Sequence, residues 1–149
     1  MNKGFTLFLA VVITGTLLLI ATGIITLAVK QSLISTAGRE SQIAFYVADT
    51  GLECALYWDV KNPSEASAFT PSAASSINCN RDANNSGNQW TVGGSSVSTF
   101  TISFLPNPSC AVVTVTKSVG GSTEIESRGY NTCSSGSSRR VERAVRATY

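Results

Sequence analysis

The chain has 149 residues, enough for one modest domain, and its net charge of +2 is too small to indicate nucleic acid or acidic partners. It has no histidine and so lacks the commonest general base and metal ligand. Its few lysines lie in no recognisable serine–lysine motif. We therefore expect no enzyme, no cofactor and no metal site.

The first predicted element is a membrane-spanning helix over residues 5–29, Phe5 to Val29, which contain only apolar residues, glycine and threonine. As a helix this run would be roughly 37 Å long, enough to cross a ~30 Å hydrocarbon layer with some tilt. It is longer than the apolar core of a secretory signal, and Lys30-Gln31-Ser32 offers no signal cleavage site. We predict an anchor, whose orientation the flanking basic residues do not decide.

The helix is expected to continue through residues 30–58 as an amphipathic segment, until Asn62-Pro63 stops it. Apolar and small residues recur there at three-four spacing, and polar residues do the same on the other side. The apolar set is Ile34, Ala37, Ala44, Phe45, Ala48, Leu52, Ala55 and Leu56, and the polar set is Arg39, Gln42, Tyr46, Asp49 and Glu53.

Residues 59–149 are predicted to form a β-rich head. Its first part is rich in serine, asparagine and glycine and is interpreted as a loop with at most a short helix. Strand patterns follow at Gln89–Val92, Val97–Leu105, Ala111–Val119, Thr123–Tyr130 and Arg140–Tyr149, with a two-residue hairpin turn at Gly120-Gly121. We expect an α+β fold in which the long helix packs on a small antiparallel sheet of about four strands.

Four widely spaced cysteines, Cys54, Cys79, Cys110 and Cys133, indicate two disulfides better than a zinc site, which usually includes a close-spaced pair. Disulfides imply an oxidising, extracytoplasmic compartment. The predicted hairpin places Cys110 opposite Asn131 and within reach of Cys133. Of the three possible connectivities we therefore favour Cys54–Cys79 with Cys110–Cys133.

The opening "KGFTL", followed at once by a charge-free helix, resembles the class III signal of type IV pilins and pseudopilins. In that family an inner-membrane peptidase cuts after the glycine, here Gly4, and methylates the next residue, here Phe5. The resemblance implies a leader over residues 1–4, a pilin helix over residues 5–58 and an extracytoplasmic head over residues 59–149. The pilin-like fold that it implies agrees with the one predicted from the residues.

A second segment, "RESQIAFYVADTGLECALYW", is similar to PilX-type minor pilins. In those proteins aromatic and alanine residues lead into an alanine-acid-x-Gly-Leu motif, here Ala48, Asp49, Thr50, Gly51 and Leu52. The resemblance covers roughly residues 1–58, and the head has no specific match.

The chain departs from the family at Leu9. Most pilins have glutamate as the fifth mature residue, and this carboxylate is thought to pair with the N-terminal amine of a neighbouring subunit. Leu9 cannot form such a pair, and the tip-capping pseudopilin of type II secretion also lacks the glutamate. Leu9 therefore argues against the main filament subunit and favours a minor, initiating or tip-proximal one.

The partners implied by the resemblance are other pilins, the prepilin peptidase, the pilus assembly platform and, before assembly, membrane lipid. Gly15 and Gly23 would allow close approach of neighbouring helices. We expect a single-pass protein of the cytoplasmic membrane, with its N-terminus inside and its head outside, that reaches the cell surface in a pilus. Two alternatives stay open, a type II secretion pseudopilin and a membrane-anchored surface binding module that does not polymerise.

Three further patterns have simple interpretations. Oxygen-bearing side chains alternate at Asn78, Asn80, Asp82, Asn84 and Ser86, but with a single charge they favour turn chemistry over calcium binding. The basic C-terminal strand carries Arg139, Arg140, Arg143 and Arg146 and is interpreted as a soluble edge strand rather than a nucleic-acid surface. Trp58 and Trp90 are expected in the core.

Overall fold

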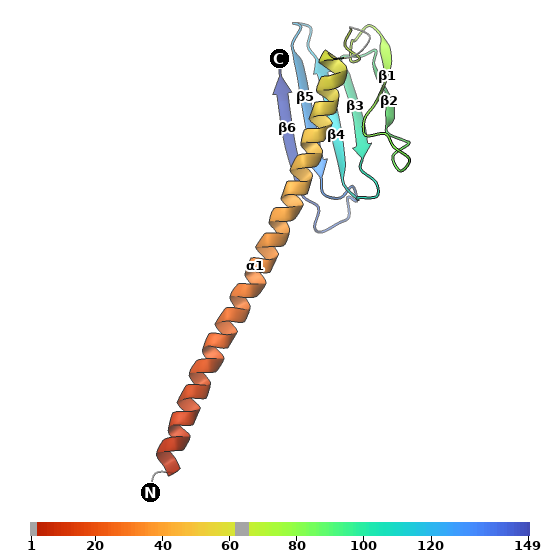
Figure 1. Cartoon of the computed structure of the whole chain (residues 1–149). Coiled ribbons are helices and arrows are strands. Elements are labelled where there is room, and N and C mark those ends of the chain that lie inside the picture. Colours follow the sequence, from red (N-terminus) through yellow and green to blue (C-terminus); the bar gives the residue numbers. More distant parts are fainter. Residues whose placement is uncertain (1–2, 62–65) are drawn as a thin grey trace. The chain divides into compact units, whose positions relative to one another are not determined.

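The computed structural model describes residues 3–61 and 66–149. One long helix is followed by six strands (Figure 1). The elements are α1 (Lys3–Val60), β1 (Ala74–Asn78), β2 (Gln89–Gly93), β3 (Val97–Ser103), β4 (Cys110–Lys117), β5 (Thr123–Tyr130) and β6 (Glu142–Thr148). The chain divides after Arg39 into two compact units, and the second begins at Glu40. The predicted α+β class is confirmed, because the C-terminal part of α1 packs on antiparallel sheet.

Helix α1 begins at Lys3 and ends at Val60, two residues beyond the predicted helix at each end. No proline interrupts it, and its leucine and alanine residues favour a helix. The predicted stop at Asn62-Pro63 lies outside the described residues.

Strands β3, β4, β5 and β6 form one antiparallel sheet in chain order, which confirms the predicted four-stranded sheet. Alternate residues of β3, β4 and β5 are buried on one face of the sheet, as the two-residue period of a strand requires, whereas β6 has no buried residue. The buried side chains of this face include Phe100, Ile102, Val113, Val115 and Ile125. The core of the second unit therefore lies between one sheet face and the helix.

The hairpin between β4 and β5 differs from the prediction. Lys117 pairs with Thr123, so the strand ends two residues before Val119 and the loop is longer than two residues. Gly121 has a φ of 87°, which glycine adopts without strain, and its amide closes the turn on Ser118. The predicted register was wrong by one residue, since Cys110 lies opposite Tyr130 and not Asn131.

The segment predicted as a loop contains a strand, β1, which pairs with β2 in a separate two-stranded sheet. The predicted strand at Gln89–Val92 therefore does not join the main sheet. Phe100 of β3 packs on the small sheet through Trp90 of β2, with ring centroids 5.1 Å apart, and on Phe69 of the preceding loop, with centroids 6.1 Å apart. Ile77 is the only large apolar residue of β1, so the sequence carries almost no alternating signal there.

The helix face that meets the sheet is narrower than predicted. Phe45 is 48% exposed, whereas Val47, absent from the predicted set, is 8% exposed. Ile34 and Ala37 also belong to the exposed part of α1. The buried residues of this face are Ala44, Val47, Ala48, Gly51, Leu52 and Ala55. Small residues dominate because the helix lies very close to the sheet.

Two glycines make this close approach possible. A Cβ atom on Gly129 of β5 would overlap the backbone oxygen of Ala44 and the backbone nitrogen of Ala48. A Cβ atom on Gly51 of α1 would overlap the Ser127 hydroxyl and lie 2.9 Å from a methyl group of Val113. The helix and β5 are therefore in contact backbone to backbone at Gly129.

We predict that Gly129→Ala lowers the free energy of unfolding by about 3 kcal/mol or more, because helix backbone cannot move aside cheaply. Gly51→Ala is expected to lower the free energy of unfolding less, by about 1–3 kcal/mol, since the new Cβ atom would meet side chains, which can shift more easily than backbone. Gly38→Ala is the matched helical control, because its Cβ would meet nothing within 4 Å. Denaturant unfolding of the full chain in micelles, followed by circular dichroism, measures all three. Equal free energies of unfolding for all three variants would contradict the close contact between α1 and the sheet.

Candidate functional site: the exposed apolar helix and the end of α1

Residues 4–39 of α1 are exposed, and those up to Val29 are only apolar residues, glycine and threonine. The large side chains of this stretch, such as Phe5, Leu19 and Val29, are each about half exposed or more. One helix of the described chain, Gly4–Val60, is long and apolar enough to cross a membrane, with a mean hydropathy of 2.5 in its most apolar window. Such an apolar surface is more stable in lipid or against other apolar helices than in water.

Four threonine hydroxyls of this stretch are hydrogen-bonded within the helix. Thr14 and Thr26 donate to the carbonyl four residues earlier, at 2.9 and 2.8 Å. Thr16 and Thr22 donate to the carbonyl three residues earlier, both at 2.9 Å. A hydroxyl bonded in this way adds little polarity to the helix surface, and so these threonines are compatible with a hydrocarbon environment.

The glycines of this stretch have no packing role in the described chain. A Cβ atom on Gly4, Gly15 or Gly23 would meet nothing within 4 Å. Their small size therefore leaves shallow surface depressions that a neighbouring helix can approach. Leu9 lies on the same exposed surface, at 48% exposure, and residues 4–29 carry no charge.

The Ala48–Leu52 motif has a structural function in this fold. Ala48, Gly51 and Leu52 are buried against the sheet, whereas Asp49 is half-buried. The spacing of the small residues in this motif thus allows the close contact with β5. Its partner in that contact, Gly129, was not predicted, because nothing local in "ESRGYN" distinguishes it from a turn glycine.

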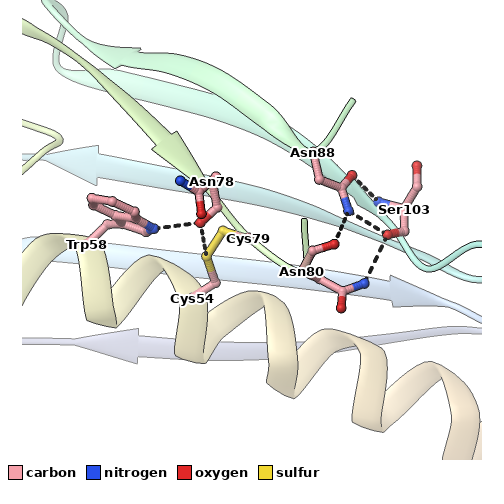
Figure 2. The surroundings of a disulfide bond; sticks show 7 residues. All are labelled: Cys54, Trp58, Asn78, Cys79, Asn80, Asn88 and Ser103. Atoms are coloured by element: carbon pink, nitrogen blue, oxygen red, sulfur yellow. Dashed lines mark hydrogen bonds between the residues drawn. A yellow bond between two sulfur atoms is a disulfide. The ribbon is translucent and has the colours of Figure 1, made fainter. Parts of the chain in front are cut away.

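The disulfides join Cys54 to Cys79 and Cys110 to Cys133, with Cα–Cα distances of 6.1 and 5.6 Å. These are the pairs expected from the hairpin. The first ties α1 to the end of β1, where the Trp58 indole also donates to the Asn78 carbonyl at 2.9 Å (Figure 2). The small sheet is therefore fastened to the helix by a covalent and a polar link.

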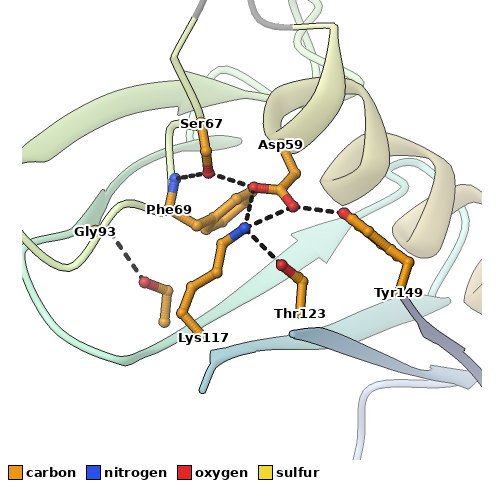
Figure 3. Close-up of polar contacts among 8 residues, drawn as sticks. Asp59, Ser67, Phe69, Gly93, Lys117, Thr123 and Tyr149 are labelled. Atoms are coloured by element: carbon orange, nitrogen blue, oxygen red, sulfur yellow. Dashed lines mark hydrogen bonds and ion pairs between the residues drawn. The ribbon is translucent and has the colours of Figure 1, made fainter. Parts of the chain in front are cut away.

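A polar cluster that the sequence did not reveal lies at the C-terminal end of α1 (Figure 3). The Asp59 carboxylate, whose side chain is 2% exposed, accepts from the Lys117 ammonium at 2.6 and 2.8 Å and from the hydroxyls of Ser67 and Tyr149. Lys117 also donates to Thr123 at 2.7 Å. Asp59, Lys117 and Tyr149 are far apart in sequence, so no local pattern could have indicated the cluster.

The cluster keeps Asp59 ionised. Burial alone would raise the pKa of Asp59, but hydrogen bonds from Lys117, Ser67 and Tyr149 and the charge of Lys117 outweigh it, and the pKa lies below its ordinary value. Burial, and then the hydrogen bond to the Asp59 carboxylate, raise the pKa of Tyr149. The ion pair thus fastens the end of the helix to β4, and Tyr149 adds a link from the residue after β6.

The asparagine-rich loop uses its single carboxylate in a turn. Asp82 accepts from the amides of Asn84 and Asn85, both at 2.8 Å, and from the Asn85 side chain at 2.9 Å. Asn85 in turn bonds the backbone of Leu105. This geometry agrees with the interpretation as turn chemistry.

The arginines of the C-terminal strand have different partners: Arg146 pairs with acids of β5, and Arg143 donates to the Ser41 hydroxyl at 2.9 Å. Arg146 lies 3.2 Å from Glu124 and 3.1 Å from Glu126, and Arg128 also pairs with Glu126. Strand β6 begins at Glu142, later than predicted, and Arg140 lies in the preceding loop over the Tyr130 ring. The edge strand therefore presents mixed charge rather than a basic stripe.

Comparisons of this chain with protein-family models, curated proteins and solved structures find no match.

We predict that Lys117→Met lowers the free energy of unfolding by about 3 kcal/mol, because it leaves Asp59 charged and buried without its cation. Lys61→Met is the control: Lys61 is exposed, so its replacement should change stability by no more than about 0.5 kcal/mol. Denaturant unfolding of the full chain measures both. Equal effects would show that the ion pair contributes nothing specific.

We also predict a loss of stability in acid that depends on Asp59. Its pKa is lower in the folded than in the unfolded chain, so its contribution is present above the ordinary value of 3.8 and is lost as the pH falls through the folded pKa. Asp59→Asn should therefore flatten the fall in stability below pH 3.8. Thermal unfolding across this pH range tests the difference, and parallel curves for Asp59→Asn and the unmodified chain would refute it.

Proposed function

We propose that this chain is a minor pilin of a type IV pilus, a structural or assembly subunit that initiates the filament or lies near its tip. The observation that carries the proposal is an exposed, charge-free helix surface that follows directly on Lys3-Gly4. Before assembly, residues 5–29 anchor the chain in the cytoplasmic membrane, with the N-terminus inside and the head outside. After extraction by the assembly platform, the same surface packs among equivalent helices.

Three features of the described residues support this. The internally bonded threonines allow the helix to exchange lipid for protein without exposing an unpaired hydroxyl. Gly15 and Gly23 offer close approach to a neighbouring helix. The two disulfides stiffen a small head domain, each typically by about 2–4 kcal/mol, in the oxidising compartment outside the membrane.

A type II secretion pseudopilin is the second candidate, and Leu9 is the observation that favours it. A carboxylate at this position would be costly in lipid unless paired. A subunit at the tip of a filament has no further subunit whose N-terminal amine could pair with this carboxylate. This applies to the tip of a pseudopilus as well as to the tip of a pilus.

N-terminal processing is the decisive measurement. Mass spectrometry of the membrane-extracted chain, expressed with a prepilin peptidase, should find a mature N-terminus at Phe5 that carries one methyl group. Gly4→Asp should leave the leader in place, because a charged side chain replaces the smallest one at the scissile bond, and Gly15→Ala should be processed normally. A chain that keeps Met1 would refute both pilin assignments.

Deletion of the encoding sequence separates the two candidates. Loss of surface filaments with normal secretion supports the minor pilin. Loss of secretion with normal filaments supports the pseudopilin and overturns the first proposal.

A further inference from the structure

An open groove of about 650 Å³ lies beside the Cys54–Cys79 disulfide, entirely within residues 40–149. The functions proposed above do not use it. One wall is α1, with Thr50, Glu53, Tyr57 and Trp58 at successive turns, and the other is the end of β1 and the residues after it, with Asn78 and Asn80. The volume lies in the range of about 300–1,000 Å³ that is typical of small-molecule sites.

The walls of the groove are held in place. The disulfide and the bond from Trp58 to the Asn78 carbonyl tie one wall to the other (Figure 2). Asn88 donates to the carbonyls of Asn80 and Ser103, at 3.2 and 2.7 Å. The site is therefore pre-formed, and ligand binding would cost little conformational entropy of the protein.

Asn80 is held in a conformation that residues other than glycine seldom adopt. Its φ of 49° lies in the left-handed region, although asparagine tolerates this better than most residues. Strain of this kind persists where the surroundings impose it, and it is concentrated at binding sites. Here it turns the chain sharply at the rim of the groove.

The groups that line the groove combine an aromatic surface with polar atoms of both kinds. The ring of Tyr57 is 49% exposed and meets that of Trp58 edge to face, with centroids 5.5 Å apart. In the described part of the chain, the Glu53 carboxylate, the Tyr57 hydroxyl and the Asn78 side chain make no hydrogen bond or ion pair. The groove thus offers a carboxylate acceptor, an amide and a phenol that are open to a ligand.

We propose that this groove binds a saccharide. A sugar ring has an apolar C–H face that stacks on an aromatic ring, and hydroxyls at its edge that both donate and accept. Glu53 would accept from these hydroxyls, and Asn78 would donate and accept. A quaternary ammonium ion would use the rings and Glu53 but leave the amide without a partner, and an apolar peptide would leave all three polar groups unpaired.

The test uses the full chain in phospholipid nanodiscs, because sugar-headed detergents would compete for the groove. The probes are N-acetylglucosamine, galactose and a β-1,4-linked glucose tetramer, and the signal is tryptophan fluorescence, since Trp58 lines the groove. We expect a saturable change with at least one probe, abolished in Trp58→Phe. No saturable change with any of the three, or a response to choline alone, would overturn the proposal.

Variants locate the binding. Glu53→Gln and Tyr57→Ala should each weaken the affinity about tenfold or more, which corresponds to about 1.4 kcal/mol. Tyr46→Ala is the matched control, because Tyr46 is 66% exposed on the same helix but does not line the groove. Affinity unchanged in both groove variants would also overturn the proposal. Leader processing is not involved in this readout, so the saccharide site and the pilin assignment succeed or fail separately.

Discussion

The close contact between α1 and β5 is the constraint on which the rest of the head depends. At Gly129 the helix backbone occupies the space that any side chain would need, and at Gly51 the helix has no side chain to separate it from Ser127 and Val113. Ser127 is fully buried there, and its hydroxyl has no hydrogen-bond partner among the described residues. A buried, unpaired hydroxyl is a cost that the dense packing of this contact has to offset.

The contact at Gly129 and Gly51 sets the distance between the helix and the sheet. Covalent and polar links from the C-terminal turns of α1 then hold the neighbouring segments of the head in place. Beyond Gly51, Cys54 reaches Cys79, Trp58 reaches Asn78, and the Asp59 carboxylate reaches Lys117. All these links come from the last turns of α1, which is why the small sheet, the groove and the buried ion pair gather at that end. The other disulfide acts away from the helix, between the start of β4 and the loop after β5.

The first unit obeys a different requirement. In residues 4–29 the helix glycines make no packing contact within the described chain, and its exposed surface carries no charge. Such a surface is stable only in lipid or among other apolar helices. One helix, α1, therefore has two kinds of surface: an exposed apolar surface in its first segment and a surface of small residues that packs on the sheet in its second. The proposed pilin function depends on the exposed apolar segment of α1, and the proposed saccharide site lies beside the segment that packs on the sheet.

The amino-acid sequence by itself determined the elements whose signals are local: the charge-free helix, the four-stranded sheet and the hairpin that brings Cys110 near Cys133. It did not indicate β1, whose only large apolar residue is Ile77, because that strand depends on its pairing with β2, which packs on Phe100 through Trp90. It placed Phe45 on the buried face, because three-four spacing does not say how wide a face the sheet can cover. Only the tertiary structure decided the Asp59 cluster, the contact at Gly129 and the groove, since each joins residues that are distant along the chain and is defined by packing rather than by periodicity.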